Sequence, residues 1–399
     1  MTKSVNDSKI FNIASAEKYG ATAKVEHVVD AVKMALKKAQ LKNASSVLLF
    51  LTNGYNQNPK PALKAAAKAA GTIQVYGATA VGLLTHNEWI MDHEGAVAMV
   101  FPEDCDLQPA NLLNSQNKLS GSLPLLCLTS PEQSKIAIND STWEQYPMFG
   151  AITSNAFGSN EYPIWQASRI TKNGFVHANF NTPANKSLTA HTIVSQGVRR
   201  ISSNLLIDES NDNCISQVSG QTPTLSLQQS IPDNMYSMLL EQPYHTLCAV
   251  SEAIHVDEDQ QNAAKTNAAN ALNKDFYRLF NIVGIDEERQ SVFLSGKVKT
   301  RQCCFWALRD NAIAEQEWDH SLKQLAKSIQ QPEFAILFCS ESRGPYFHGG
   351  NDDTDLRLFK HYFPDTPLIG VYSSGEISAG AHYQSLLRRY SSVLTIYAS

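Results

Sequence analysis

The densest group of side chains that could bind a ligand follows an apolar run near the end of the sequence, in PLIGVYSSGEIS, residues 367–378. Ser373 and Ser374 bring two hydroxyl groups, Glu376 brings a carboxylate, and Gly375 allows the backbone a positive φ angle. A turn of this composition exposes backbone N–H groups beside hydrogen-bonding side chains. We therefore expect these four residues to form the rim of a ligand-binding pocket. The alternative is that Glu376 caps a neighbouring loop and the glycine only reverses the chain.

A long polar loop, CSESRGPYFHGGNDDTD at residues 339–355, follows another apolar run. In α/β proteins the loops after buried strands tend to hold the ligand. Arg343 is the best anion binder in this loop, because its guanidinium can bind a carboxylate through two hydrogen bonds, and it could also pair with Glu376. Cys339 could be a thiolate ligand or could pack in the core. The alternative for the loop is a mobile segment that ends in a helix cap at Asp353 or the residue after it.

Composition narrows the class of protein. The 399 residues carry a net charge of −5 with a pI near 6.1, which argues against a nucleic-acid-binding protein. The first 25 residues contain no apolar signal-peptide core, and the longest apolar runs are far shorter than the roughly 20 residues of a spanning helix. Seven cysteines without a C-x-x-C pair favour reduced thiols. We therefore expect a cytoplasmic protein with no membrane span.

The sequence has none of the common catalytic motifs. It contains no G-x-S-x-G elbow, no G-x-x-x-x-G-K-[ST] loop and no G-x-G-x-x-G after a strand. We therefore expect no enzymatic activity. An enzyme that uses the Ser/Glu turn, or Cys339, remains an alternative.

The elements that must position these residues occur twice along the chain. Apolar runs at residues 45–53, 72–82 and 95–101 predict three strands, and the first two are separated by a helix that begins near Pro61 and ends at Gly71. The same order returns in strands at 334–342, 367–377 and 391–398, with a helix at 355–363. We predict an α/β (mixed α+β) fold in which duplicated strand-helix-strand-strand units form two related domains with a β-rich middle.

The boundary between the two domains is placed near residue 210, so the predicted domains are 1–210 and 211–399. By composition, residues 208–234 could be a linker. Residues 255–275 are predicted to form a surface helix or an exposed insertion.

The motifs together resemble the FIST family. The FIST C-terminal region is similar to three segments of this chain, FAILFCSESRG, PLIGVYSSGEISAG and SSVLTIYA, and also to residues 278–310. SSVLLFLTNGYN, VYGATAVGLLTHNEW and EGAVAMVF resemble the FIST N-terminal region, although Leu83 follows Gly82 where many members have Gly-Glu, so this turn lacks the carboxylate. On this resemblance, residues 208–234 form a strand and a short helix, and Thr79 joins the predicted ligand-binding residues.

The resemblance implies a ligand-binding sensor in bacterial signal transduction, working through a partner because the chain has no kinase segment of its own. A stand-alone subset of the family binds haem, senses nitric oxide and regulates a histidine kinase. If this chain does so, haem b is bound without covalent attachment, and the candidate iron ligands are His86, His93 and His348, of which one or two are expected. A second hypothesis is a sensor of a small metabolite such as an amino acid, without haem. Expected partners are a histidine kinase or other signalling protein and a small-molecule ligand, with no nucleic acid, and a homo-oligomer is possible.

Overall fold

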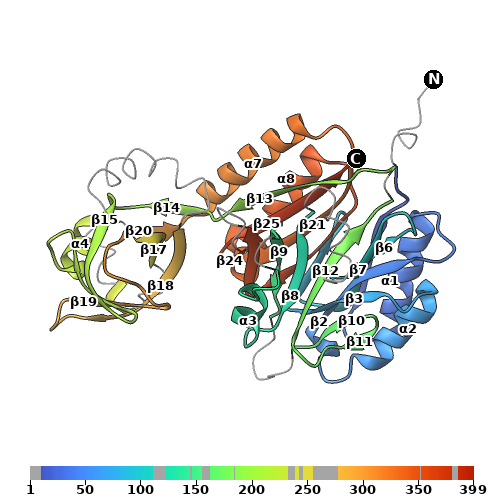
Figure 1. Cartoon of the computed structure of the whole chain (residues 1–399), viewed down its shortest axis with the longest axis horizontal. Coiled ribbons are helices and arrows are strands. Elements are labelled where there is room, and N and C mark those ends of the chain that lie inside the picture. Colours follow the sequence, from blue (N-terminus) through green and yellow to red (C-terminus); the bar gives the residue numbers. More distant parts are fainter. Residues whose placement is uncertain are drawn as a thin grey trace. The chain divides into compact units, whose positions relative to one another are not determined.

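The computed structural model describes residues 10–110, 123–143, 146–154, 162–183, 185–231, 239–241, 246–254, 277–350, 352–379 and 385–399 (Figure 1). The chain divides into two compact units, which are described separately. The first consists of Met1–Gln196 and Glu315–Ser399, and the second of Gly197–Ala314. Among the described residues there is no helix long and apolar enough to cross a membrane.

Within the described residues, the first unit is built from three repeats of one strand–helix pattern. Repeat 1 comprises β1 (Ala14–Gly20), α1 (Val25–Lys38), β2 (Ser46–Thr52), α2 (Lys60–Ala70), β3 (Val75–Ala80), the hairpin β4 (Gly82–Thr85) and β5 (Trp89–Ile90), and β6 (Glu94–Phe101). Repeat 2 comprises β7 (Asp106–Pro109), β8 (Leu125–Thr129), α3 (Ser134–Ile138), β9 (Met148–Ile152), the hairpin β10 (Ile164–Gln166) and β11 (Arg169–Ile170), and β12 (Phe175–Asn181). Repeat 3 comprises β13 (Thr189–Ser195), α7 (Asn311–Ser328), β21 (Pro332–Ser340), α8 (Thr354–Tyr362), β22 (Leu368–Ser373), the hairpin β23 (Gly375–Ala379) and β24 (Ser385–Arg388), and β25 (Ser392–Ala398).

The repeats exchange their hairpins. Sheet 1 has the order β1-β6-β2-β3-β10-β11, sheet 2 the order β7-β12-β8-β9-β23-β24, and sheet 3 the order β13-β25-β21-β22-β4-β5. In every sheet the central pair is parallel and its neighbours are antiparallel. The outer hairpin of each sheet comes from another repeat: repeat 1 supplies sheet 3, repeat 2 supplies sheet 1, and repeat 3 supplies sheet 2.

A glycine marks the same position in all three repeats. It is the third residue of the second parallel strand, and it faces a residue of the first strand in the pairs Leu49–Gly77, Cys127–Gly150 and Leu337–Gly370. A Cβ atom at Gly150 would lie 1.7 Å from the backbone oxygen of Cys127. Since no side chain fits there, this glycine is required for the two strands to pair.

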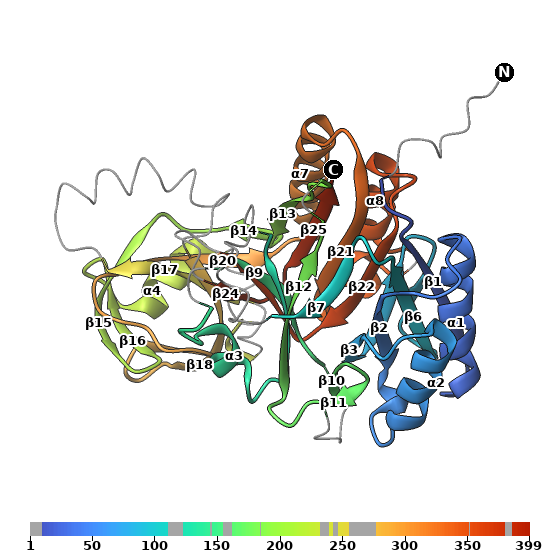
Figure 2. The same cartoon turned by 45° about the vertical axis from the view of Figure 1, so that its right-hand side comes forward.

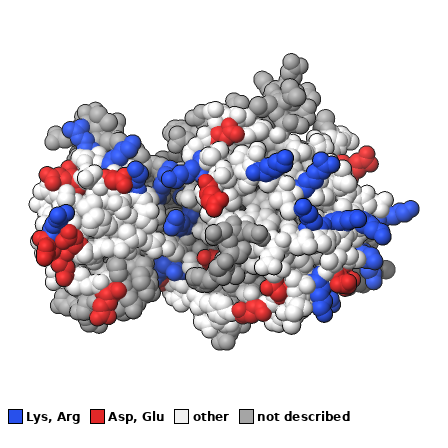
Figure 3. Space-filling model, turned by 90° about the horizontal axis from the view of Figure 1, so that it is seen from below, with Lys and Arg blue, Asp and Glu red and all other residues white. Residues whose placement is uncertain are grey.

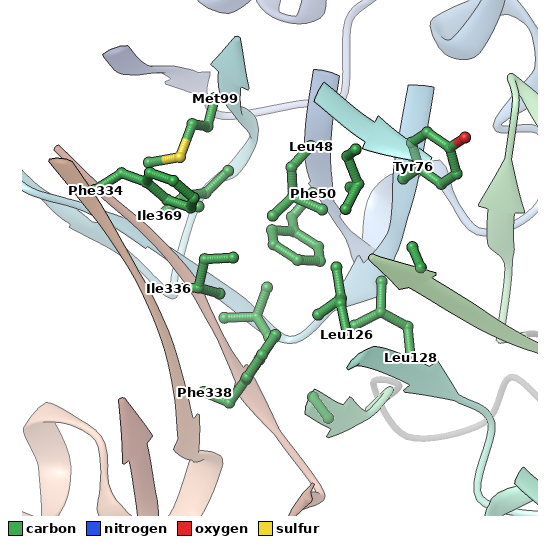
Figure 4. Close-up of a cluster of buried hydrophobic side chains, with 14 of the residues drawn as sticks. Leu48, Phe50, Tyr76, Met99, Leu126, Leu128, Phe334, Ile336, Phe338 and Ile369 are labelled. Carbon is green, nitrogen blue, oxygen red and sulfur yellow. The ribbon is translucent and has the colours of Figure 1, made fainter. Parts of the chain in front are cut away.

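The three sheets share one core. Their inner faces contribute the side chains in Figure 4, among them Leu48 and Phe50 of sheet 1, Leu126 of sheet 2, and Ile336 and Phe338 of sheet 3. The opposite faces of sheets 1 and 3 are covered by helices, α1 and α2 on sheet 1 and α7 and α8 on sheet 3 (Figure 2). Helix α3 covers part of sheet 2.

The second unit is an antiparallel sheet that closes on itself. It contains β14 (Val198–Arg200), β15 (Leu205–Asn211), β16 (Cys214–Val218), α4 (Pro223–Ser230), β17 (Thr246–Ile254), β18 (Tyr277–Asp286), β19 (Ser291–Leu294) and β20 (Gln302–Arg309). The order β20-β15-β16-β19-β18-β17 returns to β20, which pairs with β17. Inside, the indole of Trp306 is fully buried and donates a hydrogen bond to the Ser226 hydroxyl of α4 at 3.0 Å.

The predicted mixed α+β fold with duplicated units is confirmed, and the structure adds a third copy, repeat 2, inside the β-rich middle. The compact units divide the chain differently from the predicted domains 1–210 and 211–399, because strand β13 of repeat 3 precedes the second unit in the chain. Residues 208–234 contain β15, β16 and α4. The predicted insertion at 255–275 lies outside the described residues.

Candidate functional site

The C-terminal ends of the parallel strands β21 and β22 carry a buried network of charged groups. Arg343 ends a short 3-10 turn that follows β21. Its Nε and Nη2 donate hydrogen bonds to the two carboxylate oxygens of Asp355, at 3.0 and 3.3 Å, and both side chains are only 1% exposed. The guanidinium lies over the ring of Trp318 at 6.0 Å, and the indole N–H of Trp318 donates to the backbone oxygen of Asp355 at 3.0 Å. This two-point geometry keeps a buried ion pair stable.

Cys339 and Ser392 extend the network towards β25. The Ser392 hydroxyl contacts the Cys339 sulfur at 3.3 Å and donates a hydrogen bond to Asp355. Burial and the nearby negative charge of Asp355 raise the pKa of Cys339 well above its usual value. The thiol is therefore the stable form, which disfavours Cys339 as a thiolate ligand.

Asp353 joins the loop to both α8 and β22. As the N-cap of α8 it accepts a hydrogen bond from the backbone N–H of Leu356 at 2.6 Å, which confirms the predicted helix cap. The Tyr372 hydroxyl donates to its other oxygen. Burial and the charge of Asp355 raise the pKa of Asp353 to about 6.

Glu376 lies fully buried on β23, in sheet 2. It accepts hydrogen bonds from the Ser373 hydroxyl at 2.9 Å and from the Ser391 hydroxyl at 2.6 Å. Burial raises the pKa of Glu376 to about 8, although both serines and the charge of Arg343 oppose the shift. At neutral pH this carboxyl group is therefore mostly protonated, and Arg343 and Glu376 each have partners of their own.

The remaining residues of the predicted turn are divided between the inside and the surface. Gly375 is buried and begins β23, opposite Ile152. Ser374 is exposed, and its hydroxyl donates to the backbone oxygen of Thr153 at 3.1 Å. Thr79 is buried on β3 of sheet 1, where it has the position in its repeat that Tyr372 has in β22.

The β4–β5 hairpin, which carries His86, lies beside the loop between β21 and α8, which carries His348. The hairpin β4–β5 pairs with β22, and the Tyr346 hydroxyl donates a hydrogen bond to Asp92 just beyond the hairpin. Met91 is also close, since a Cβ atom at Gly344 would lie 3.3 Å from its sulfur. The hairpin of repeat 1 thus contacts the loop of repeat 3.

The three histidines have different surroundings. His86 packs edge-on against Phe359 of α8, with ring centroids 6.2 Å apart. His348 is half-buried beside Phe347; its Nε2 is buried and has no hydrogen-bond partner among the described residues. Burial lowers the pKa of His348, so its imidazole is neutral near pH 7. His93 is exposed and contacts the ring of Tyr19.

The sequence patterns do not indicate Asp355 and Ser391, which provide the partners of Arg343 and Glu376. Asp355 was visible only as one acid in a polar loop, and nothing in its spacing indicates an ion pair. In the described part of the chain no three His, Cys, Asp or Glu side chains are grouped to hold a metal ion. A haem would need only one or two ligands from the protein.

Two models of known families together match most of the chain. The model of the FIST N domain matches residues 45–221, from β2 to the end of the β15–β16 pair, and the model of the FIST C domain matches residues 244–379. No curated protein matches the chain. FIST domains are associated with sensing in signal transduction. Because the two matches follow each other along the chain and include the whole buried network except Ser391 and Ser392, this protein belongs to the FIST family.

Proposed function

We propose that the protein is a ligand-binding sensor in bacterial signal transduction and that it binds its ligand at the C-terminal ends of β21 and β22. Open α/β sheets bind ligands at this end of their parallel strands. Groups with perturbed pKa values gather at functional sites. Here the pKa of Glu376 is raised to about 8 and that of Asp353 to about 6, both within one buried network.

The ligand in this proposal is haem b, nitric oxide is the signal, and a histidine kinase is the partner. The observation that supports it is His348, whose buried Nε2 has no hydrogen-bond partner among the described residues and whose lowered pKa favours the neutral, metal-binding form. His348 would hold the iron, with His86 as the second candidate because the β4–β5 hairpin that carries His86 pairs with β22 of repeat 3, the repeat that contains the loop of His348. A bound haem would supply the iron atom that takes up nitric oxide.

The test is a visible absorption spectrum of the purified protein during titration with hemin, before and after nitric oxide. We expect a saturable Soret band that shifts with nitric oxide. His348→Ala should abolish the band or displace it, whereas His361→Ala, a change at an exposed position of α8, should leave it unchanged. A featureless spectrum without saturable uptake of hemin would refute haem binding. An unaltered band in His348→Ala would refute the assignment of the ligand.

The regulatory half of the proposal needs the kinase. Autophosphorylation of a candidate partner histidine kinase should change when the haem-loaded protein is added, and nitric oxide should alter that effect. If the autophosphorylation rate is the same with the haem-loaded protein before and after nitric oxide as without it, this partner is refuted, whereas haem binding is not.

The second candidate is a sensor of an amine-bearing metabolite such as an amino acid, and it is favoured by Glu376. A buried carboxyl group with a pKa near 8, hydrogen-bonded to Ser373, can bind an ammonium group by releasing its proton. Arg343 would bind the carboxylate of the metabolite, which requires exchange of its ion pair with Asp355.

A thermal-shift screen of amino acids would find the ligand. For a hit, titration calorimetry in buffers of different ionisation enthalpy should show release of about one proton from Glu376, because the ammonium group stabilises the ionised form. Arg343→Ala should weaken binding, and the exposed Arg357→Ala serves as the control. Unchanged affinity in Arg343→Ala would refute this role.

A further inference from the structure

The helices that cover sheet 1 carry most of their charge as lysine. Between residues 21 and 72 the sequence has eight lysines and two acidic residues, a net charge of +6 in a chain whose total is −5. The rest of the chain therefore carries −11. Figure 3 shows blue side chains gathered at the right-hand end, where α1 and α2 lie in Figure 1. We call this surface the lysine face; it consists of the exposed side chains of Lys33, Lys37, Lys42, Lys60, Lys64 and Lys68.

Helix α2 shows how regular the lysine face is. Lys60, Lys64 and Lys68 recur every four residues and are exposed, while Ala62, Leu63 and Ala66 pack on sheet 1. None of these three lysines forms an ion pair with a described carboxylate. Like charges four residues apart destabilise a helix by a few tenths of a kcal/mol each. The stripe therefore does not serve the stability of α2.

We propose that the lysine face binds an acidic surface of a partner protein. A surface that carries charges of one sign raises the association rate with a partner surface of opposite charge, and it orients that partner as it approaches. The exposed Met34 of α1, among these lysines, provides an apolar contact of the kind enriched in protein interfaces. The proposal does not depend on which ligand the site in repeat 3 binds.

Nucleic acid and membrane fit this surface less well. Residues 21–72 contain no arginine, the residue that binds phosphate through two hydrogen bonds, and their two aromatic residues, Phe50 and Tyr55, are buried. A helix that lies in a membrane surface presents Trp, Phe or Leu beside its basic residues. The exposed large apolar side chains in and next to this part of the described chain are Tyr19, Met34 and Ile73.

The experiment measures binding of fluorescein-labelled poly-L-glutamate by anisotropy, with the full chain, from 50 to 300 mM NaCl. We expect affinity to fall steeply with salt, and the Lys60→Glu/Lys64→Glu/Lys68→Glu variant to bind at least about tenfold more weakly. The control, Lys299→Glu/Lys323→Glu/Lys327→Glu, has the same change of net charge at exposed positions elsewhere and should lose less than about twofold. The matching Lys→Gln triple variant repeats the test without added negative charge, and circular dichroism verifies folding.

Equal losses in the two Glu variants would overturn the proposal, because net charge alone would then explain binding. Tighter binding of a single-stranded DNA oligonucleotide, or of phosphatidylserine vesicles, than of poly-L-glutamate at 150 mM NaCl would also overturn it if the same three lysines account for that binding. Loss of poly-L-glutamate binding only in the α2 variants supports it.

Discussion

Breaking the buried pair of Arg343 and Asp355 should cost far more stability than breaking an exposed pair. Arg343→Met leaves the Asp355 carboxylate in a site that is 1% exposed, without its cation. Removing one partner of a buried ion pair typically costs about 3–5 kcal/mol, because the remaining charge loses both water and its partner. The matched control is Arg357→Met, which removes the pairs of a half-exposed guanidinium with Glu315 and Asp352 and should cost about 0–1 kcal/mol.

The assay is urea unfolding followed by tryptophan fluorescence, since Trp318 lies beside the Arg343 guanidinium and reports on this site. The double variant Arg343→Met/Asp355→Asn removes the uncompensated charge as well. It should be less destabilised than the sum of its two single variants, because the two effects share one interaction. Equal losses for Arg343→Met and Arg357→Met, or strict additivity in the cycle, would refute the reasoning that this pair holds the loop to α8.

Three further predictions test other parts of the structure. Gly150→Ala should lower the free energy of unfolding, measured in urea, by more than about 2 kcal/mol, because its Cβ would overlap a backbone oxygen. The control is Gly284→Ala, whose Cβ meets its nearest atom at 3.8 Å and which should change stability by less than about 1 kcal/mol. Similar effects of the two changes would contradict the close approach of β8 and β9. The pKa of Glu376 rises from 4.5 in the unfolded chain to about 8 in the folded one, so its ionisation disfavours folding. As the pH rises between those values, the free energy of unfolding of the wild type should fall by up to about 1.4 kcal/mol per pH unit relative to Glu376→Gln. Parallel curves of stability against pH for the two proteins would show that the carboxyl group is not buried as described. In native protein the partly exposed Cys214 should react with a disulfide reagent at least about tenfold faster than Cys339, whose buried thiol has a raised pKa; equal rates by peptide mass mapping would argue against that burial.

The repeat pattern was predictable where the helices are long enough to show it. Apolar spacing and the Gly77 and Gly370 turns were sufficient for repeats 1 and 3. Repeat 2 has the same glycine, Gly150, but its helix α3 extends over only 5 residues, which is too short for a 3.6-residue pattern to stand out. The exchange of hairpins was not predictable, because pairing between β4 and β22 depends on residues almost three hundred positions apart.

The site was predicted in part for the same reason. Local turn chemistry indicated Ser373 and Glu376 as neighbours, and the hydrogen bond between them agrees with that. The cap at Asp353 was also a local signal. The hydrogen bond from Tyr346 to Asp92 joins residues 254 positions apart, and no local pattern in one sequence indicates such a contact.

The exchange of hairpins has a consequence for how the chain can be cut. A fragment that ends near residue 210 contains β9 without β23, and a fragment that begins there contains β22 without β4, so each fragment exposes open strand edges that favour aggregation. The two family regions therefore exchange strands with each other within the first unit. The second unit, Gly197–Ala314, is different, because it is inserted in the chain between β13 and the rest of α7. Its strands take part in none of the exchanged pairings. Replacing Gly197–Ala314 with a short loop from Gln196 to Glu315 would remove the closed sheet as a unit. A cut between repeats, in contrast, would separate the exchanged hairpins from the sheets that they complete.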